Sequence, residues 1–370
     1  MLSGHALLRK SVFFLLAALL YLSFFSATYS HANQLTLPQG FQIKEFAKGL
    51  DKPRFMATSP DEVLFAALMG KGLIAALPDG DRDGRADRVI KFLGGLDLPN
   101  SIEFHSGYLY VGESTKITRV KYNGFDKKPG RKEVIVPDLP SEGHFTKTIG
   151  FGPDGKLYVS MGSSCNVCIE ADERRATIMR YNPDGSGGEV FARGLRNSVG
   201  FEWHPVTREL WASDNGRDWL GDDLPPEEVN IVREGGHYGW PYCYGDGVVD
   251  PKFGTPEICE KTIPPVFQMQ AHSAPLGVAF YTGKKFPASY HNDLFIAFHG
   301  SWNRTEPTGY KVVRIKIKND RPIGSEDFVS GWLKGQRAWG RPADVHVGIR
   351  GEMYISDDRG GRIYIVTYGQ

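Results

Sequence analysis

The sequence has no excess of charge of either sign. Its 370 residues include 44 Lys and Arg against 43 Asp and Glu, which gives a formal net charge of +1 without a basic tract. Proteins that bind nucleic acids or anionic membranes usually carry a concentrated positive patch. The composition therefore predicts no nucleic-acid or membrane partner and favours a small-molecule ligand.

The sequence also has almost no helical periodicity. Apolar residues alternate with polar ones over short segments, and the chain contains 44 Gly and 23 Pro residues. Glycine and proline are typical of tight turns rather than of helix interiors. This pattern excludes a helical bundle and an alternating β/α fold, and it predicts an all-β chain.

The N-terminus has the pattern of a secretory signal. The basic segment "LLRK" precedes the apolar run "SVFFLLAALLYLSFF" and small residues that end at Ser30-His31-Ala32. We expect a signal peptide over residues 1–32, a single mature domain over 33–370, and a periplasmic or secreted protein without stable membrane insertion after cleavage. A retained N-terminal anchor is the alternative, although the run is short for a membrane span.

Cysteine is rare, with four residues in the whole chain. An even number of cysteines in an exported protein indicates disulfides. We favour the local pairs Cys165 with Cys168 and Cys243 with Cys259, because short loops close at the lowest entropic cost. The crossed pairings and a four-cysteine zinc site remain alternatives.

One strand unit recurs along the chain. Each copy reads as an alternating strand, a turn, a second strand of the form "LYV", a polar loop and a third strand. The six copies begin "RFMATSPDEVLFAAL", "NSIEFHSGYLYVGES", "KTIGFGPDGKLYVSMGS", "NSVGFEWHPVTRELWASDNG", "PLGVAFYTGKKFPASYHNDLFIAFHGS" and "PADVHVGIRGEMYISDDRGG". Six such units predict a six-bladed β-propeller with four-stranded antiparallel blades. We expect the N-terminal segment "FQIKEFA" to pair into the last blade and close the ring.

Polar residues should meet at one mouth of the central channel. In an antiparallel meander, the start of the first strand and the end of the second strand lie on the same side of the sheet. Residues in these two positions include Arg54, Arg196, Asn197, Arg341 and His299. Guanidinium and carboxamide groups suit an anionic, planar ligand with several carboxylates. The alternative is that these are ordinary loop residues bonded to backbone carbonyls.

His144 is the candidate base at this mouth. It precedes the first strand of the third unit, within "EGHFTKTIGFGPDG". A neutral imidazole there can take a proton from a substrate hydroxyl near neutral pH. A structural histidine bonded to a neighbouring loop would show the same spacing.

Two acidic segments are candidate calcium sites. In the first, "DGDRDGRAD", alternate carboxylates surround a turning glycine, but no Glu occupies the twelfth position of an EF-hand. The second, "GDDLPPEEVN", is a long loop in the fourth unit. The candidate ligands are Asp79, Asp81, Asp83 and Asp87 in the first segment, and Asp222, Asp223 and Glu228 in the second. Solvated acidic loops are the alternative in both cases.

Five segments together resemble one family, the pyrroloquinoline-quinone-dependent soluble sugar dehydrogenases of the glucose/sorbosone dehydrogenase group. The resemblance covers nearly all of the mature chain. The segments that carry it are "GHFTKTIGFGPDGKLYVSMGS", "FARGLRNSVGFEWHP", "DDLPPEEVNIVREGGHYGWP", "IAFHGSWNR" and "GRPADVHVG". It implies pyrroloquinoline quinone and Ca²⁺ as cofactors, a sugar as substrate and an external electron acceptor.

The resemblance also implies roles for single residues. His144 corresponds to the general base that acts on the anomeric hydroxyl while hydride passes to the quinone, and Arg196 with Asn197 corresponds to a pair that contacts the cofactor. Arg341, His299 and Arg54 are similar to further contacts, and Glu228 aligns with a calcium ligand. Gly143 stands where glucose-oxidising members carry an acidic residue, and Asp222-Asp223 replaces their Gly-Pro. The implied substrate is therefore an aldose, pyranose or sorbosone-like sugar.

Two other functions fit a propeller of this kind. A calcium-dependent sugar lactonase would polarise a carbonyl with the metal and would need no quinone. A protein-binding propeller would present a flat or apolar upper face. The convergence of arginine, asparagine and histidine residues at one mouth favours the quinone enzyme over both.

Overall fold

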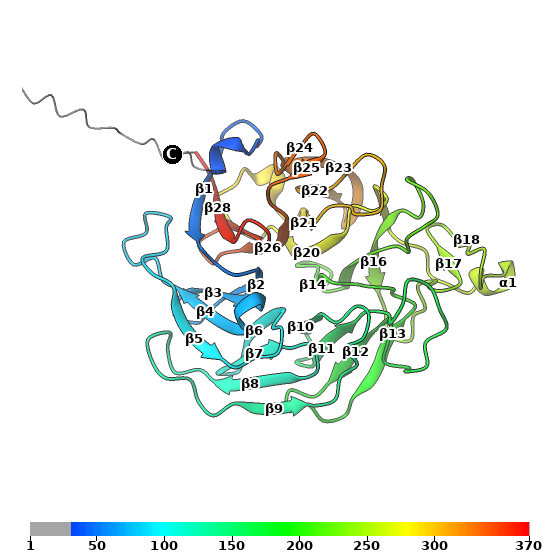
Figure 1. Ribbon diagram of the computed structural model, residues 1–370, viewed down its shortest axis with the longest axis horizontal. Helices are drawn as coiled ribbons and strands as arrows, with labels where there is room; N and C mark the ends of the chain where they lie inside the picture. The colour runs from blue at the N-terminus through cyan, green and yellow to red at the C-terminus, as the bar shows by residue number, and fades with distance from the viewer. Residues whose placement is uncertain (1–30, 370) are drawn as a thin grey trace, which may run out of the picture.

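Six four-stranded antiparallel sheets form a ring in the computed structural model, which describes residues 31–369 (Figure 1). The predicted all-β, six-bladed propeller is confirmed. The signal peptide expected over residues 1–32 lies outside the described residues, except for its last two positions.

The strands follow one another from the channel outwards in five of the blades, and the sixth blade takes its outer strand from the N-terminus. In order along the ring, the blades are β2 (Pro53–Thr58), β3 (Leu64–Leu68), β4 (Leu73–Leu77), β5 (Ile90–Gly94); β6 (Ser101–His105), β7 (Tyr108–Gly112), β8 (Ile117–Lys121), β9 (Glu133–Val136); β10 (Lys147–Phe151), β11 (Leu157–Met161), β12 (Thr177–Tyr181), β13 (Glu189–Arg193); β14 (Phe201–Trp203), β15 (Leu210–Asp214), β16 (Glu227–Val232), β19 (Phe267–Met269); β20 (Pro275–Phe280), β21 (Leu294–Phe298), β22 (Lys311–Lys318), β23 (Arg321–Val329); and β26 (Pro342–Val347), β27 (Met353–Asp357), β28 (Arg362–Tyr368), β1 (Phe41–Lys48).

A few short elements decorate this ring. In the described part of the chain, two small hairpins and three helical turns lie between the strands of the blades, and a fourth helical turn precedes β1. They are β17 (Cys243–Tyr244) with β18 (Val248–Val249), β24 (Leu333–Lys334) with β25 (Arg337–Ala338), α1 (Pro256–Cys259), η1 (His31–Gln34), η2 (Met69–Lys71) and η3 (Ala288–Tyr290). None of the described helices is long and apolar enough to cross a bilayer.

The apolar core is divided among the blade interfaces. Each of the six largest clusters of buried apolar residues joins two neighbouring blades, and a smaller one lies where first strands meet around the channel. A strand packed between two blades is covered on both faces, which explains why "LFAAL" in β3 is apolar and buried throughout. Burial of this surface is the main force that holds the ring together.

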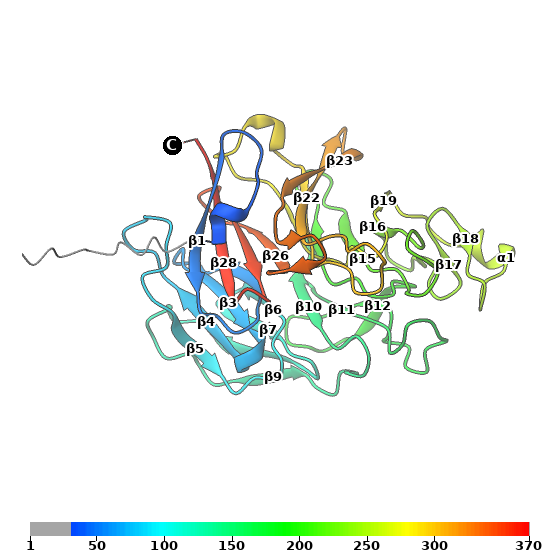
Figure 2. The same ribbon diagram turned by 45° about the horizontal axis from the view of Figure 1, so that its top comes forward.

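The ring is closed by its two ends. β1 pairs with β28 in an antiparallel register from Phe41 opposite Tyr368 to Lys48 opposite Arg362, and both views show the two strands side by side (Figures 1 and 2). The ring of Phe41 meets those of Phe286, Tyr290, Phe328 and Tyr368 edge to face, at centroid distances from 4.8 to 5.0 Å. The expected closure by "FQIKEFA" is therefore confirmed.

The four cysteines form the two local disulfides that the sequence favours. Cys165 pairs with Cys168, and Cys243 pairs with Cys259, so none of them is free. The crossed pairings and the zinc site are excluded.

We predict that Phe41→Ala lowers the free energy of unfolding by about 2 kcal/mol, because the substitution removes an aromatic anchor between the closing strand and the fifth blade. Denaturant unfolding followed by tryptophan fluorescence measures this change. Gln42→Ala, at an exposed position of the same strand, should change the value by less than about 0.5 kcal/mol. Equal effects of both substitutions would show that Phe41 does not anchor the strand.

Candidate functional site

A pocket of about 510 Å³ opens at one mouth of the channel. This volume is typical of cavities that bind small ligands. The pocket walls come from the starts of first strands and from the loops after second strands, as the meander argument predicts. The lining residues are Lys52, Arg54, Met69, Gly143, His144, Phe145, Thr146, Asn197, Val199, Leu276, His299, Arg341, Asp358 and Arg359.

The pocket carries a surplus of positive charge. Four basic side chains line it, from Lys52, Arg54, Arg341 and Arg359, against the single carboxylate of Asp358. The chain as a whole is electrically balanced, so this surplus is a local property of the mouth. A cavity with such walls attracts an anionic ligand.

Asp358 is held by two neighbours. Nη1 of Arg54 lies 2.8 Å from its Oδ2, and Nε2 of His299 lies 2.9 Å from its Oδ1. Burial by itself would raise the pKa of Asp358, but the hydrogen bond from His299 and the charge of Arg54 hold this pKa well below its usual range. The carboxylate stays ionised and offsets one of the four cations.

Arg341 is fixed at the pocket wall by backbone groups. Its Nε donates to the carbonyl of His299 at 2.9 Å, and its Nη2 donates to the carbonyl of Gly300 at 2.7 Å. Among the contacts of the described residues, Nη1 of Arg341 has no hydrogen-bond partner. Arg341 can therefore hold an anionic group of a ligand without losing its own anchors.

His144 has one defined tautomer. Its Nδ1 lies 3.0 Å from both the carbonyl oxygen and the Oγ of Ser163. The Ser163 hydroxyl donates its own proton to the carbonyl of Cys165 at 2.7 Å, so both Ser163 atoms act as acceptors toward the ring. Nδ1 must then carry the proton, which leaves the lone pair on Nε2.

The imidazole of His144 is neutral at physiological pH. Burial, together with the positive charges of Arg196 and Arg175, lowers the pKa of His144 to about 4. Desolvation and nearby cations both disfavour a second proton on the ring. A neutral ring with a free Nε2 is the form that can act as a general base.

Gly143 and Gly162 are required for this arrangement. Gly143 has a φ of +67°, and a Cβ there would lie 2.3 Å from the carbonyl oxygen of Ser164. A Cβ at Gly162 would lie 2.5 Å from Oδ1 of Asn197 and 2.5 Å from Cβ of His144. Only glycine allows the chain to bring these two side chains so close. The structure thus gives a steric reason for the missing acidic side chain at position 143.

Asn197 reaches the pocket from a turn that Asp214 holds in place. Oδ1 of Asp214 accepts hydrogen bonds from the backbone N–H of Asn197 at 2.7 Å and from the hydroxyl of Ser198 at 3.1 Å. Its Oδ2 accepts the backbone N–H of Arg196 at 2.9 Å. This buried carboxylate fixes the backbone before β14 and so orients the Asn197 side chain.

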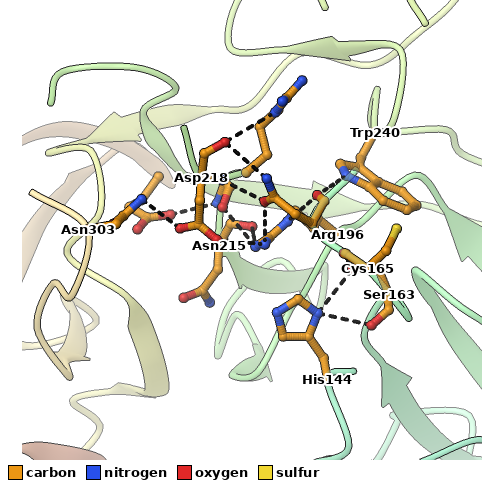
Figure 3. Close-up of polar contacts among 12 residues, drawn as sticks. His144, Ser163, Cys165, Arg196, Asn215, Asp218, Trp240 and Asn303 are labelled. Carbon is orange, nitrogen blue, oxygen red and sulfur yellow. Dashed lines mark hydrogen bonds and ion pairs between the residues drawn. The ribbon is translucent and has the colours of Figure 1, made fainter. Parts of the chain in front are cut away.

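Arg196 does not line the pocket. Arg196 is buried and lies near His144 in the close-up (Figure 3), and protein groups accept all five N–H bonds of its guanidinium. The acceptors are the backbone carbonyls of Asn166, Asn215 and Gly216 and the side chains of Asn166 and Asp218. Each N–H bond of the guanidinium thus has a protein acceptor in this placement, and the expected contact of Arg196 with a cofactor stays a prediction.

Asn166 connects the parts of this network. Its Oδ1 accepts both Nη2 of Arg196, at 3.0 Å, and the backbone N–H of Asp218, at 2.7 Å. It lies inside the loop closed by the Cys165–Cys168 disulfide, directly after the residue whose carbonyl binds Ser163. The small disulfide loop therefore bonds to Arg196 directly and to Ser163, the residue that holds the ring of His144 (Figure 3).

The three candidate calcium ligands of the fourth blade are separated. Oδ1 of Asp222 accepts the backbone N–H of Thr305 at 3.0 Å, and Oδ1 of Asp223 lies 2.9 Å from Nη2 of Arg304. Glu228 is buried on β16, where its carboxylate accepts hydrogen bonds from Gly245 N–H and Asn230 Nδ2. Across residues 31–369, these acids are not among the groups close enough to share one metal ion.

The aspartate segment between β4 and β5 does bring carboxylates together. Asp79, Asp81 and Asp87 place one oxygen each within 4.8 Å of one another. Asp83 is not part of this group, and its Oδ1 accepts the backbone N–H of Arg85 at 2.8 Å. Calcium binding in this segment stays a prediction.

A second cavity, of about 300 Å³, follows the channel toward the opposite mouth. It is lined by the carboxyl groups of Glu103, Glu202 and Asp344, which lie on three different first strands. Burial raises the pKa of Glu103 to about 7 and the pKa values of Glu202 and Asp344 to about 8. Glu202 and Asp344 are therefore mostly protonated at neutral pH and Glu103 is about half protonated, so the three groups together carry less negative charge than three ordinary carboxylates.

Sequence reasoning missed Asn166 and Asp218, which position other residues, and Lys52, which lines the pocket. The segment "CNVC" contained a usable signal, since a residue between two bridged cysteines beside a predicted mouth has little conformational freedom. For Lys52 there was no such signal, because a lysine that lines a pocket and an ordinary exposed lysine before a strand have the same local sequence pattern.

Comparison with known proteins identifies the family of the chain. A family model described as Glucose / Sorbosone dehydrogenase matches residues 105–365. An uncharacterised protein of Borreliella burgdorferi is 33% identical over 355 residues, which cover 91% of each chain. The aldose sugar dehydrogenase YliI of Escherichia coli is 27% identical over 80% of this chain and 82% of its own. The holo form of the PQQ domain of pyranose dehydrogenase from Coprinopsis cinerea has the same fold, with a TM-score of 0.78 at 19% identity over 90% of this chain and 97% of that one. The chain therefore belongs to the glucose/sorbosone dehydrogenase family.

Proposed function

We propose that this protein is an exported quinoprotein that oxidises the anomeric hydroxyl or aldehyde of an aldose, pyranose or sorbosone-like sugar with pyrroloquinoline quinone as cofactor. The observation that carries the proposal is the cationic pocket with a neutral His144 in its wall. Membership of the glucose/sorbosone dehydrogenase family supports it, and the two disulfides support export to an oxidising compartment.

The pocket fits the quinone in charge and size. Pyrroloquinoline quinone is a planar tricarboxylate, and Lys52, Arg54, Arg341 and Arg359 surround a volume of about 510 Å³. Their side chains would hold the carboxylates, with Asn197 as a neutral hydrogen-bond donor. The chemistry that the bound quinone supplies is that of a two-electron acceptor.

The protein's own part in the reaction is to position a base. The N–H at Nδ1 of His144 is fixed by Ser163, so Nε2 accepts the proton of the sugar hydroxyl. Loss of that proton places negative charge on the sugar oxygen and weakens the adjacent C–H bond, whose hydrogen would be transferred as hydride to the bound two-electron acceptor. An anomeric hydroxyl is thereby converted to a lactone carbonyl, and the proton on His144 returns to solvent.

Calcium has no defined place in this mechanism. Asp222, Asp223 and Glu228 lie apart and are engaged by protein donors, so this set does not fit a single ion and no step is derived through it. The lactonase alternative needs a metal held by carboxylates in the pocket, whereas the lining contains Asp358 alone, paired with Arg54.

We predict that the purified mature protein, supplied with pyrroloquinoline quinone and calcium, reduces an artificial electron acceptor when given an aldose. Calorimetry of the protein with the quinone should show saturable binding, and a panel of aldoses and sorbosone assayed by dye reduction should identify the substrate. Binding that is absent in calorimetry would overturn the assignment of the cofactor.

We predict that His144→Gln lowers kcat by at least about 10²-fold, because the amide keeps the hydrogen-bonding capacity but cannot take a proton. Affinity for the quinone should change little. His291→Gln, which changes an exposed histidine in the loop between β20 and β21 of the fifth blade, is the matched control and should keep full activity. Turnover that survives in His144→Gln would show that another group is the base.

We predict that His144 stays neutral down to about pH 5 in the cofactor-free protein, because its pKa is lowered to about 4 by burial and by Arg196. The lowered pKa means that the uncharged form persists as the pH falls and is lost only near pH 4. NMR of protein with labelled histidine, assigned with the His144→Gln variant, measures the midpoint. A midpoint near 6.5 would contradict the desolvated site.

A further inference from the structure

Two tryptophans are exposed on the rim of the same mouth. Trp219 lies in the loop between β15 and β16, and Trp302 lies in the loop between β21 and β22. Each is 67% exposed, and their rings meet edge to face with centroids 5.3 Å apart and an interplanar angle of 87°. His299, which lines the pocket, begins the loop that carries Trp302. The aromatic pair is therefore a neighbour of the pocket.

Polar contacts between the two loops hold the rings in place. Nδ2 of Asn303 donates to Oδ1 of Asp218 at 2.8 Å, and Nη2 of Arg304 lies 2.9 Å from Oδ1 of Asp223. Asn303 and Asp218 are the chain neighbours of the two tryptophans. The two loops that carry the pair are thus joined to each other by a hydrogen bond and an ion pair.

Asp218 also connects the rim to the buried network around Arg196. Oδ2 of Asp218 lies 3.4 Å from Nη2 of Arg196, and the backbone N–H of Asp218 donates to Asn166. Figure 3 shows Asn303, Asp218 and Arg196 in this sequence, with His144 close by. These contacts are made by Asp218 and not by the indole of Trp219, so the loop stays anchored when the indole is removed.

The backbone at Trp219 is strained. Its φ is +73°, a left-handed conformation that is costly for a bulky side chain and is common for glycine and asparagine. A tryptophan that is both strained and exposed contributes little to the stability of the fold. Such positions are typical of ligand-binding sites.

The size of the exposed patch fits a sugar better than a protein. Two indoles at this exposure present roughly 300 Å² in total, whereas a stable protein interface needs roughly 800 Å² on each partner. The C–H face of a pyranose ring packs on one indole, and its hydroxyls can bond to the charged and amide groups around the pair. Asp223, whose side chain is 86% exposed in the loop that carries Trp219, provides such a group.

We propose that Trp219 and Trp302 form a second carbohydrate subsite, which holds a non-reacting unit of an oligosaccharide while its reducing end enters the pocket. This inference rests on the proposed function and deepens it, because it assigns two further residues to the binding of a sugar unit that does not react. The reacting unit is bound by the pocket, and the rim supplies affinity for the next units.

The test compares Trp302→Ala and Trp219→Asn with the wild-type protein. Asparagine tolerates the left-handed backbone at position 219, so this variant removes the indole without new strain. Ile349→Ala, which removes an apolar side chain that is 61% exposed between β26 and β27 at the opposite mouth, is the control. The probes are glucose, maltotriose and cellotriose.

Binding is measured first, on the cofactor-free protein, by saturation-transfer NMR. The wild type should transfer saturation to protons of the non-reducing units of at least one trisaccharide, and both tryptophan variants should lose this transfer. In the quinone-loaded enzyme, the variants should lower kcat/KM for that trisaccharide at least five-fold and leave the value for glucose within two-fold. The control should match the wild type in both assays.

The outcomes separate the subsite from the proposed function. Saturation transfer that depends on the tryptophans in a protein that oxidises no sugar would support the subsite and overturn the enzyme. Turnover of sugars without any transfer to non-reducing units would overturn the subsite alone. Variants that oxidise every sugar normally but reduce a protein electron acceptor more slowly would show that the rim binds the acceptor instead.

Discussion

Antiparallel pairing between β1 and β28 joins the two ends of the described chain, and the position of every site residue depends on it. A propeller blade has apolar residues on both faces, so an open ring would expose the faces of its first and last blades. Phe41 and its four aromatic neighbours complete the closure. Once the ring is closed, the starts of all first strands face one mouth, and the side chains of Arg54, His144 and Arg341 meet there although they are far apart in sequence.

Behind the mouth, a buried arginine organises the loops. A guanidinium without partners would cost several kcal/mol to bury, but Arg196 has an acceptor for each of its five N–H bonds, and these acceptors come from two loops. Its charge also helps to keep His144 neutral. The same residue thus holds the third and fourth blades in register and sets the protonation state of the proposed base. A contact with a cofactor is not needed to explain why an arginine stands at this position.

Much of the fold follows from local patterns. The alternation in "KLYVS", the turn "PDG" and the recurrence of the unit predict strands, hairpins and blades, because each depends on a few neighbouring residues. Local spacing also explains why the two disulfides are predictable. The pocket was predictable to the extent that it follows from strand direction: His144, Asn197, Arg54, Arg341 and His299 all line it. Asp222 and Asp223 were grouped with Glu228 by proximity in sequence, but the first two lie in an exposed loop and the third lies in a buried strand.

By itself, the sequence determined the repeated strand, the number of blades, the strand that closes the ring and the mouth at which polar residues gather. Only the tertiary structure decided which of those residues face the pocket. Arg196 and Arg341 occupy equivalent positions in their blades, yet Asn166, Asn215 and Asp218 turn the first one inward, whereas the carbonyls of His299 and Gly300 hold the second at the wall. The direction of a long side chain is set by acceptors that other loops supply. These loops come together only when the ring is closed, so no local sequence pattern predicts the direction of the side chain.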